Sequence, residues 1–348
     1  MLNLQNILNQ DIWLQYSSTD GQIYKLRLGS TGAISNIINS ESTELLCPSY
    51  QDEKTDRIIQ WTLWSETLQN PITTLPKFEY RYNVTQSGDF KGNFNPTLSI
   101  TVDKDTINVY SAPILNWKSE QQTYFTGGFK ALTQYKINPN NTSIIHISRY
   151  IFVDKIFYSN QLTKLGSVYL EAWTPLHKSI YNSIAMSFNS NYKPEWWYDD
   201  KNLPQYPNFK LDNTNGYMIA FDSTNFDNES FAIIYGKENL SKDQGEVLIN
   251  MTSWNTGIGL LPALSINNLE QYNLIELNYA IMFNKGLNEK FITIVESTVH
   301  TIPKPKIYNT ITIQSNKKLY DIYNTLYRLN SINGIQTDQI GTLLFKKN

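Results

Sequence analysis

The chain has little of several residue types that define common protein classes. It contains one cysteine, Cys47, in 348 residues, which excludes an internal disulfide framework and a cysteine-rich zinc module. Charged residues make up 17% of the chain, and 29 Lys and Arg against 31 Asp and Glu give a formal net charge of -2. Without a basic block, the chain lacks the electrostatic signature of a nucleic-acid-binding protein.

Long apolar segments are also missing. No run reaches the roughly 18 consecutive apolar residues of a transmembrane helix, so no membrane span is predicted. The N-terminus has no apolar segment preceded by a basic one, so no signal peptide is predicted either. These observations leave the localisation open among the cytoplasm, a virus particle and a secreted form whose leader has been removed.

Aromatic residues, in contrast, are abundant, with 23 Tyr, 15 Phe and 8 Trp. Many short segments alternate apolar and polar residues. Residues 13–16 and 22–28 flank the turn at Asp20 and Gly21 and predict a hairpin, and 98–102 with 107–110 predict a second. Further strands are predicted at 144–153, 168–173, 184–188, 217–221, 231–235, 275–283 and 291–295. The pattern is typical of an all-β protein, a large antiparallel two-layer β-sandwich.

One helix is predicted near the C-terminus. Ser315 or Asn316 can cap its start, and Gly334 can end it. The apolar residues of one face recur at helical spacing: Leu319, Ile322, Tyr323, Leu326 and Leu329. We expect a single sandwich domain over 1–300, followed over 301–348 by a connector, this helix and a tail. The helix would pack on the sheet or on a partner.

Motifs for nucleotide binding and for serine hydrolysis are absent. The histidines, His146, His177 and His300, are at least 31 residues apart in the sequence, so they form no local metal pair. We therefore predict no cofactor and no metal site. Cys47 follows two leucines and is typical of a core residue. His177 is different because it follows Pro175 at a strand end, where loops often hold functional side chains.

Two aromatic segments lie beside charged residues. In the first, Asp56 and Arg57 precede Trp61 and Trp64. Strand alternation places these two tryptophans on opposite faces, so both can be buried only if neither face is solvated. Sugar rings stack their apolar faces on Trp and Tyr, and their hydroxyls bond with carboxylates and arginine. The segment therefore suggests a sugar-binding surface, with structural packing as the alternative.

The second segment, 194–200, contains three consecutive aromatic residues. Trp196, Trp197 and Tyr198 are followed by Asp199 and a further acid. This composition does not fit a half-buried strand and predicts a loop that displays aromatic faces next to carboxylates. The alternative is that the tryptophans anchor a long loop to the sandwich.

Glu171 is the best candidate for acid–base catalysis. It shares a strand face with Tyr169 and Trp173, where a carboxyl group is either buried with a shifted pKa or points into a cleft. His177 would be its second group. The other acids that could form a catalytic pair are Asp56, Asp89, Glu195, Asp199 and Asp200.

The strand rhythm of residues 146–153, 168–175 and 274–286 is similar to that of a known family. These segments resemble the galactose-mutarotase-like domains of aldose epimerases and of several polysaccharide lyases and glycosidases. The resemblance implies a supersandwich fold that covers residues 10–300. It also implies a histidine-rich strand end and a catalytic glutamate near the C-terminus, with which His177 and Glu296 align loosely.

The sequence thus supports two classes of function. The first is a carbohydrate-active or carbohydrate-binding protein that takes an oligo- or polysaccharide; as an enzyme it would be a glycoside hydrolase or a polysaccharide lyase. The second is a non-enzymatic structural or assembly subunit of a virion, secretion system or toxin complex, since aromatic residues also favour protein interfaces. A homo-oligomer fits either class, and a carrier of small molecules or lipids is a third possibility.

Overall fold

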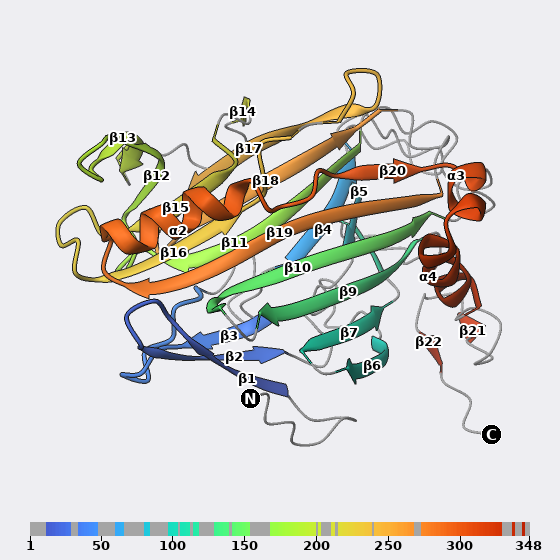
Figure 1. Cartoon of the computed structure of the whole chain (residues 1–348), viewed down its shortest axis with the longest axis horizontal. Coiled ribbons are helices and arrows are strands. Elements are labelled where there is room, and N and C mark those ends of the chain that lie inside the picture. The colour runs from blue at the N-terminus through green and yellow to red at the C-terminus, as the bar shows by residue number, and fades with distance from the viewer. Residues whose placement is uncertain are drawn as a thin grey trace.

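Two large antiparallel sheets dominate the computed structural model of the chain (Figure 1). The structure describes residues 12–28, 34–47, 60–65, 80–83, 97–103, 105–111, 114–117, 129–138, 141–153, 168–199, 201–202, 210–212, 215–238, 240–267, 273–328, 336–337 and 343–344. Together the sheets confirm the predicted all-β sandwich.

The larger sheet has ten strands. In spatial order they are β13 (Pro194–Asp199), β12 (Ser183–Phe188), β15 (Tyr217–Phe221), β16 (Glu229–Ile234), β19 (Leu274–Lys285), β10 (Asn141–Val153), β9 (Phe129–Asn138), β7 (Thr106–Ser111) and β6 (Thr97–Asp103). The tenth, β20 (Lys306–Tyr308), pairs with β19. Thus β13 lies at an edge of this sheet.

The second large sheet has seven strands in the order β14 (Lys210–Asp212), β17 (Gly245–Ser253), β18 (Gly257–Ile266), β11 (Val168–His177), β4 (Gln60–Ser65), β5 (Tyr80–Asn83) and β8 (Ile114–Trp117). A small N-terminal sheet contains β1 (Ile12–Ser17), β2 (Ile23–Leu28) and β3 (Ile34–Ile38). Near the C-terminus, β21 (Gln336–Thr337) pairs with β22 (Leu343–Leu344). Both predicted hairpins are confirmed, as β1–β2 and β6–β7.

The main core lies between the inner faces of the large sheets and extends under the N-terminal sheet. Along β19, alternate residues point into it: Ile275, Leu277, Tyr279, Ile281 and Phe283. Residues from β18 meet them from the other sheet: Ile258, Leu260, Leu264 and Ile266. This period of two is the alternation expected of strands that are buried on one face.

Three helices are present in the described residues: α2 (Glu289–Val299), α3 (Thr310–Ser315) and α4 (Lys317–Arg328). The predicted C-terminal helix is confirmed as α4, and the side chain of Asn316 caps it by accepting the backbone N–H of Leu319 at 3.1 Å. Its apolar stripe packs on the outer face of the ten-stranded sheet, against Tyr150 and Phe152.

The predicted strand at 291–295 is wrong, because this segment is part of α2. Its run of β-branched residues favours a strand locally. Asn288 decides for the helix by accepting the backbone N–H of Phe291 at 3.0 Å. The buried residues then recur at helical spacing: Phe291, Ile292, Val295 and Val299. In Figure 1, α2 lies across the outer face of β15 and β16.

Candidate functional site

The predicted loop at 194–200 is instead the edge strand β13 through Asp199, and its burial alternates. Trp196 and Tyr198 pack against the main core. Trp197 lies on the opposite, outer face, because it pairs with Ala185, which pairs with Ile219 of the apolar cluster under α2. The three aromatics therefore do not form one displayed surface.

A β-bulge interrupts the pairing of β13 with β12. The pairing of β12 with β13 shifts between Ala185 and Ser187, and the backbone N–H of Trp196 donates to Ser187 Oγ at 3.1 Å. Asp199 ends the strand by accepting the backbone N–H groups of Lys201 and Asn202 at 3.1 and 3.0 Å. Its carboxylate, a predicted sugar partner, thus holds a turn.

Beside the outward face of β13 lies a pocket of about 540 Å³, which we call the outer groove. This volume is in the usual range of small-molecule sites. Its walls come from four places in the fold: the β12–β13 hairpin, the start of β15, the turn after β16 and the C-terminal end of α2. The lining residues are Ser187, Phe188, Glu195, Asn215, Tyr217, Lys237, Glu296, Val299 and His300.

Two glycines bring the walls of the outer groove together. Gly216 and Gly236 have φ angles of 79° and 82°, which other residues rarely adopt. The carbonyl oxygen of Gly216 accepts the N–H groups of Tyr235 and Gly236 at 2.8 and 3.0 Å. A Cβ on Gly216 would lie 2.6 Å from the carbonyl carbon of Gly236. This close contact places Tyr217 next to Lys237.

The polar chemistry of the outer groove centres on Glu296. The hydroxyl of Tyr217 donates to Glu296 Oε1 at 3.2 Å, and Phe188 stacks on the Tyr217 ring at a centroid distance of 6.5 Å. Burial, reinforced by Glu296, raises the pKa of Tyr217, so the phenol stays a protonated donor. Within the described part of the chain, Glu195, Glu296 and Lys237 form no ion pair.

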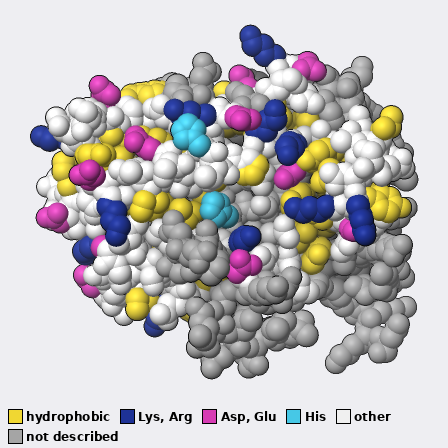
Figure 2. All heavy atoms as spheres, in the orientation of Figure 1, with side chains coloured by type: hydrophobic (Ala, Val, Ile, Leu, Met, Phe, Trp, Pro, Cys, Tyr) yellow, Lys and Arg dark blue, Asp and Glu magenta, His cyan; other side chains and the backbone are white. Residues whose placement is uncertain are grey.

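An aromatic surface continues from the outer groove along the same face. The Trp197 ring lies 6.0 Å from Phe221, and Phe221 lies 5.8 Å from Phe226. Phe221 is buried, whereas Trp197 and Phe226 are 40% and 45% exposed. We call these three residues the aromatic platform. Figure 2 shows that the face covered by α2 mixes acidic, basic and hydrophobic side chains without a block of one charge.

The other predicted site residues lie in the seven-stranded sheet or outside the described residues. Asp56 and Arg57 fall outside them, as do the acids Asp89 and Asp200. Trp61 pairs with Ala172 and Trp64 with Tyr169, so their positions on β4 alternate as predicted.

Glu171 and His177 both belong to β11. At the rise of an extended strand, six residues separate them by about 20 Å. The catalytic role of Glu171, with His177 as its second group, stays a prediction. The His177 carbonyl accepts the N–H groups of Ile180 and Tyr181 at 3.0 and 2.8 Å, so its backbone closes the turn after β11.

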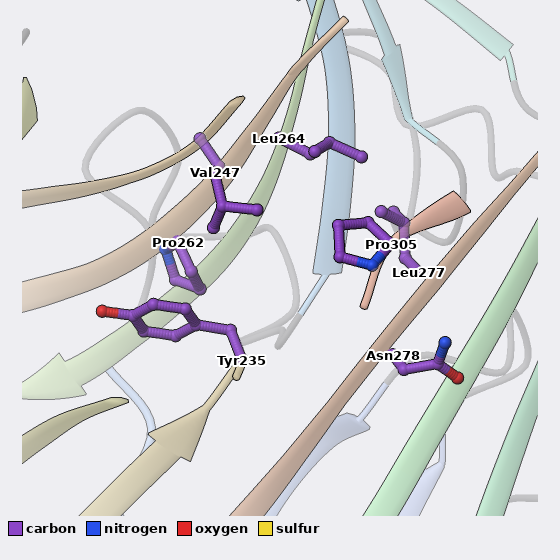
Figure 3. Close-up of a pocket in the computed structure, with 8 residues that line it drawn as sticks. Tyr235, Val247, Pro262, Leu264, Leu277, Asn278 and Pro305 are labelled. Carbon is purple, nitrogen blue, oxygen red and sulfur yellow. The ribbon is translucent and has the colours of Figure 1, made fainter. Parts of the chain in front are cut away.

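A second pocket lies between the sheets and is too small for a ligand. Figure 3 shows Tyr235 and Pro262 side by side, with Leu277 and Pro305 across from them. The cavity volume is about 20 Å³, which is room for about one water molecule.

In the described residues, no group of three His, Cys, Asp or Glu side chains is arranged to hold a metal ion. No helix there is long and apolar enough to cross a membrane.

The sequence pattern predicts Glu195 as one candidate catalytic acid, whereas only the family resemblance points to Glu296. Tyr217, Lys237, Phe226 and His300 were not linked to a site. Their contribution depends on turns and on α2, whose helical period at 291, 292, 295 and 299 was the available signal.

No family model matches the sequence, and no curated protein does. Solved structures match at low identity. A 4-alpha-glucanotransferase from Thermococcus litoralis is 9% identical with a TM-score of 0.42, over 82% of this chain and 40% of that one. An aldose epimerase homologue from C. elegans is 8% identical with a TM-score of 0.36, over 80% of this chain and 100% of its own.

A galactose mutarotase-like protein from Clostridium acetobutylicum is 10% identical with a TM-score of 0.35, over 79% of this chain and 94% of its own. Two of these matches, at TM-scores of 0.36 and 0.35, are therefore to proteins with aldose epimerase or galactose mutarotase names, and the resemblance is weak.

Proposed function

We propose that this protein binds carbohydrate in the outer groove, with Trp197 as the stacking residue. One observation carries the proposal. Glu195 and Trp197 lie two residues apart on the outward face of an edge strand, so a carboxylate that lines a polar pocket stands next to an exposed indole ring.

This arrangement matches the two kinds of surface on a sugar. The apolar C–H face of a ring can stack on Trp197 and Phe226. The hydroxyls can donate to the carboxylates of Glu195 and Glu296 and accept from Lys237. The mixed charge of the groove favours a neutral sugar over a strongly anionic one.

A binding screen with a matched control tests the proposal. Purified protein would be titrated with an oligosaccharide library, with intrinsic tryptophan fluorescence as the signal. Trp197→Ala should weaken binding about two- to tenfold, the value of one aromatic contact. Trp13→Ala should leave it unchanged, because Trp13 is equally exposed, at 42%, but lies in β1. Equal affinities of the two variants would refute the assignment.

Cleavage of a glycosidic bond is the enzymatic form of this proposal. Glu195 and Glu296 line the same groove and are available as an acid and a base. In a hydrolysis, one carboxyl group would protonate the leaving oxygen while the other activates water. Product formation that Glu296→Gln abolishes without loss of binding would support it. Glu171 stays a separate prediction in the other sheet, tested by Glu171→Gln in the same assay.

An assembly subunit is the second candidate. The exposed Trp197 and Phe226 also suit a protein interface, since such interfaces are enriched in aromatic residues. Analytical ultracentrifugation of the unmodified protein and of Trp197→Ala distinguishes the two. An oligomer that the variant dissociates, together with a blank sugar screen, would favour assembly.

A further inference from the structure

We infer that the outer groove and the aromatic platform are two subsites for one ligand, a chain of linked sugars rather than a single monosaccharide. This inference rests on the proposed function and goes further by naming the size class of the ligand. It follows from the length of the surface and from the different chemistry at its two ends.

The length comes from β15. Tyr217 lines the outer groove and Phe221 lies in the aromatic platform, and both are on the outer face of this strand. Four residues of extended strand separate them by about 13 Å. On the edge strand β13, which β12 separates from β15, Glu195 and Trp197 repeat the same order at about 7 Å. The surface is therefore longer than one sugar ring.

The two ends offer different contacts. The groove end presents Glu195, Glu296 and Lys237, which suit hydroxyl groups. The platform end presents the exposed rings of Trp197 and Phe226, with buried Phe221 between them, and suits a ring face. A ligand that reaches only one end gains only part of the available contacts. A chain that spans both gains the second contact at high effective concentration.

The walls are held in place before any ligand arrives. α2 is fixed to the sheet by buried Phe291, Ile292 and Val295, and Phe188 stacks on Tyr217. On the other side of β13, Trp196 anchors the edge strand to the main core. A ligand therefore has little ordering cost to overcome in this surface, which favours weak contacts added along its length.

A chain-length series tests the inference. The unmodified protein would be titrated by calorimetry with the monosaccharide, disaccharide, trisaccharide and tetrasaccharide of the sugar that binds in the library screen. We expect affinity to rise at least about tenfold between the monosaccharide and the trisaccharide and then to level off. Affinity that does not depend on chain length overturns the inference and leaves the proposed function standing. No binding by any sugar overturns both.

Two variants then assign the subsites. Glu195→Gln and Trp197→Ala should each weaken the trisaccharide, whereas the monosaccharide should respond strongly to only one of them. Trp197→Phe keeps a ring and should restore most of the affinity, which separates loss of stacking from loss of folding. If both variants weaken the monosaccharide and the trisaccharide by the same factors, the two-subsite inference is wrong.

Discussion

Removal of the Glu229 carboxylate should strongly destabilise the contact between the N-terminal sheet and the sandwich. Glu229 is 5% exposed. It accepts the hydroxyl of Tyr24 at 2.7 Å and the side-chain N–H of Asn39 at 2.9 Å, both from the N-terminal part of the chain. Lys285 lies 3.9 Å from it. This one side chain at the start of β16 therefore joins β2 and the end of β3 to the sandwich.

The magnitude follows from what the substitution leaves behind. In Glu229→Ala, the buried donors of Tyr24 and Asn39 lose their acceptor, and each such group costs about 1–3 kcal/mol. We expect a loss of about 3–5 kcal/mol in the free energy of unfolding, as for other broken buried charge contacts. Glu229→Gln keeps one acceptor oxygen and should cost about 1–2 kcal/mol.

Urea unfolding followed by circular dichroism measures this loss. Glu41→Ala is the matched control, because Glu41 contacts the same Lys285 at 3.2 Å but is largely exposed, so it should cost less than about 1 kcal/mol. Equal costs for Glu229→Ala and Glu41→Ala would refute the reasoning. Limited proteolysis should also cut the N-terminal sheet sooner in Glu229→Ala.

Three further predictions concern pH, the edge strand and the turns of the outer groove. Burial raises the pKa of several tyrosines, so the folded state holds their protons more tightly than the unfolded state does. Their contribution to the free energy of unfolding should be fully present below about pH 10 and should decrease above it, as measured by urea midpoints across pH. These tyrosines are Tyr16, Tyr24, Tyr135, Tyr181, Tyr217 and Tyr235. Trp196→Ala should lower the free energy of unfolding by about 2–3 kcal/mol through lost core packing, whereas Trp197→Ala should lower it by less than about 1 kcal/mol; equal losses in chemical denaturation would contradict the two-faced strand. Gly216→Ala should lower the melting temperature more than Gly21→Ala, because both have positive φ but only Gly216 would meet backbone atoms, at 2.6 Å; similar melting temperatures would count against the close turns.

The strands and α4 could be predicted because their signals are local. Alternation around Gly21 gives a hairpin whose register then follows, with Ser17 opposite Ile23. The α4 stripe repeats at helical spacing and has its cap at Asn316. In α2, however, a β-branched run has strand propensity. The helix forms there because one residue caps it and because its apolar face is buried on the sheet, and this burial is a tertiary effect that the local sequence does not show.

The site was harder to predict because its residues come from separate elements. Glu195 was only one of several nominated acids, and its place beside Glu296 depends on α2 crossing β15. Trp196 and Trp197 are identical in type and adjacent in sequence, yet one is a core anchor and the other is exposed. Composition suggests aromatic contact with sugar, but only pairing with β12 decides which ring faces outward.

Fluorine NMR of protein labelled with 5-fluorotryptophan tests the central claim most directly. The chain has eight tryptophans, and Trp197→Phe identifies the resonance of Trp197 by its disappearance. On titration with the oligosaccharide that binds in the library screen, the Trp197 resonance should shift while that of Trp13 stays in place. A sugar that shifts another tryptophan but not Trp197, or a library in which no sugar shifts any resonance, would contradict carbohydrate binding at the outer groove.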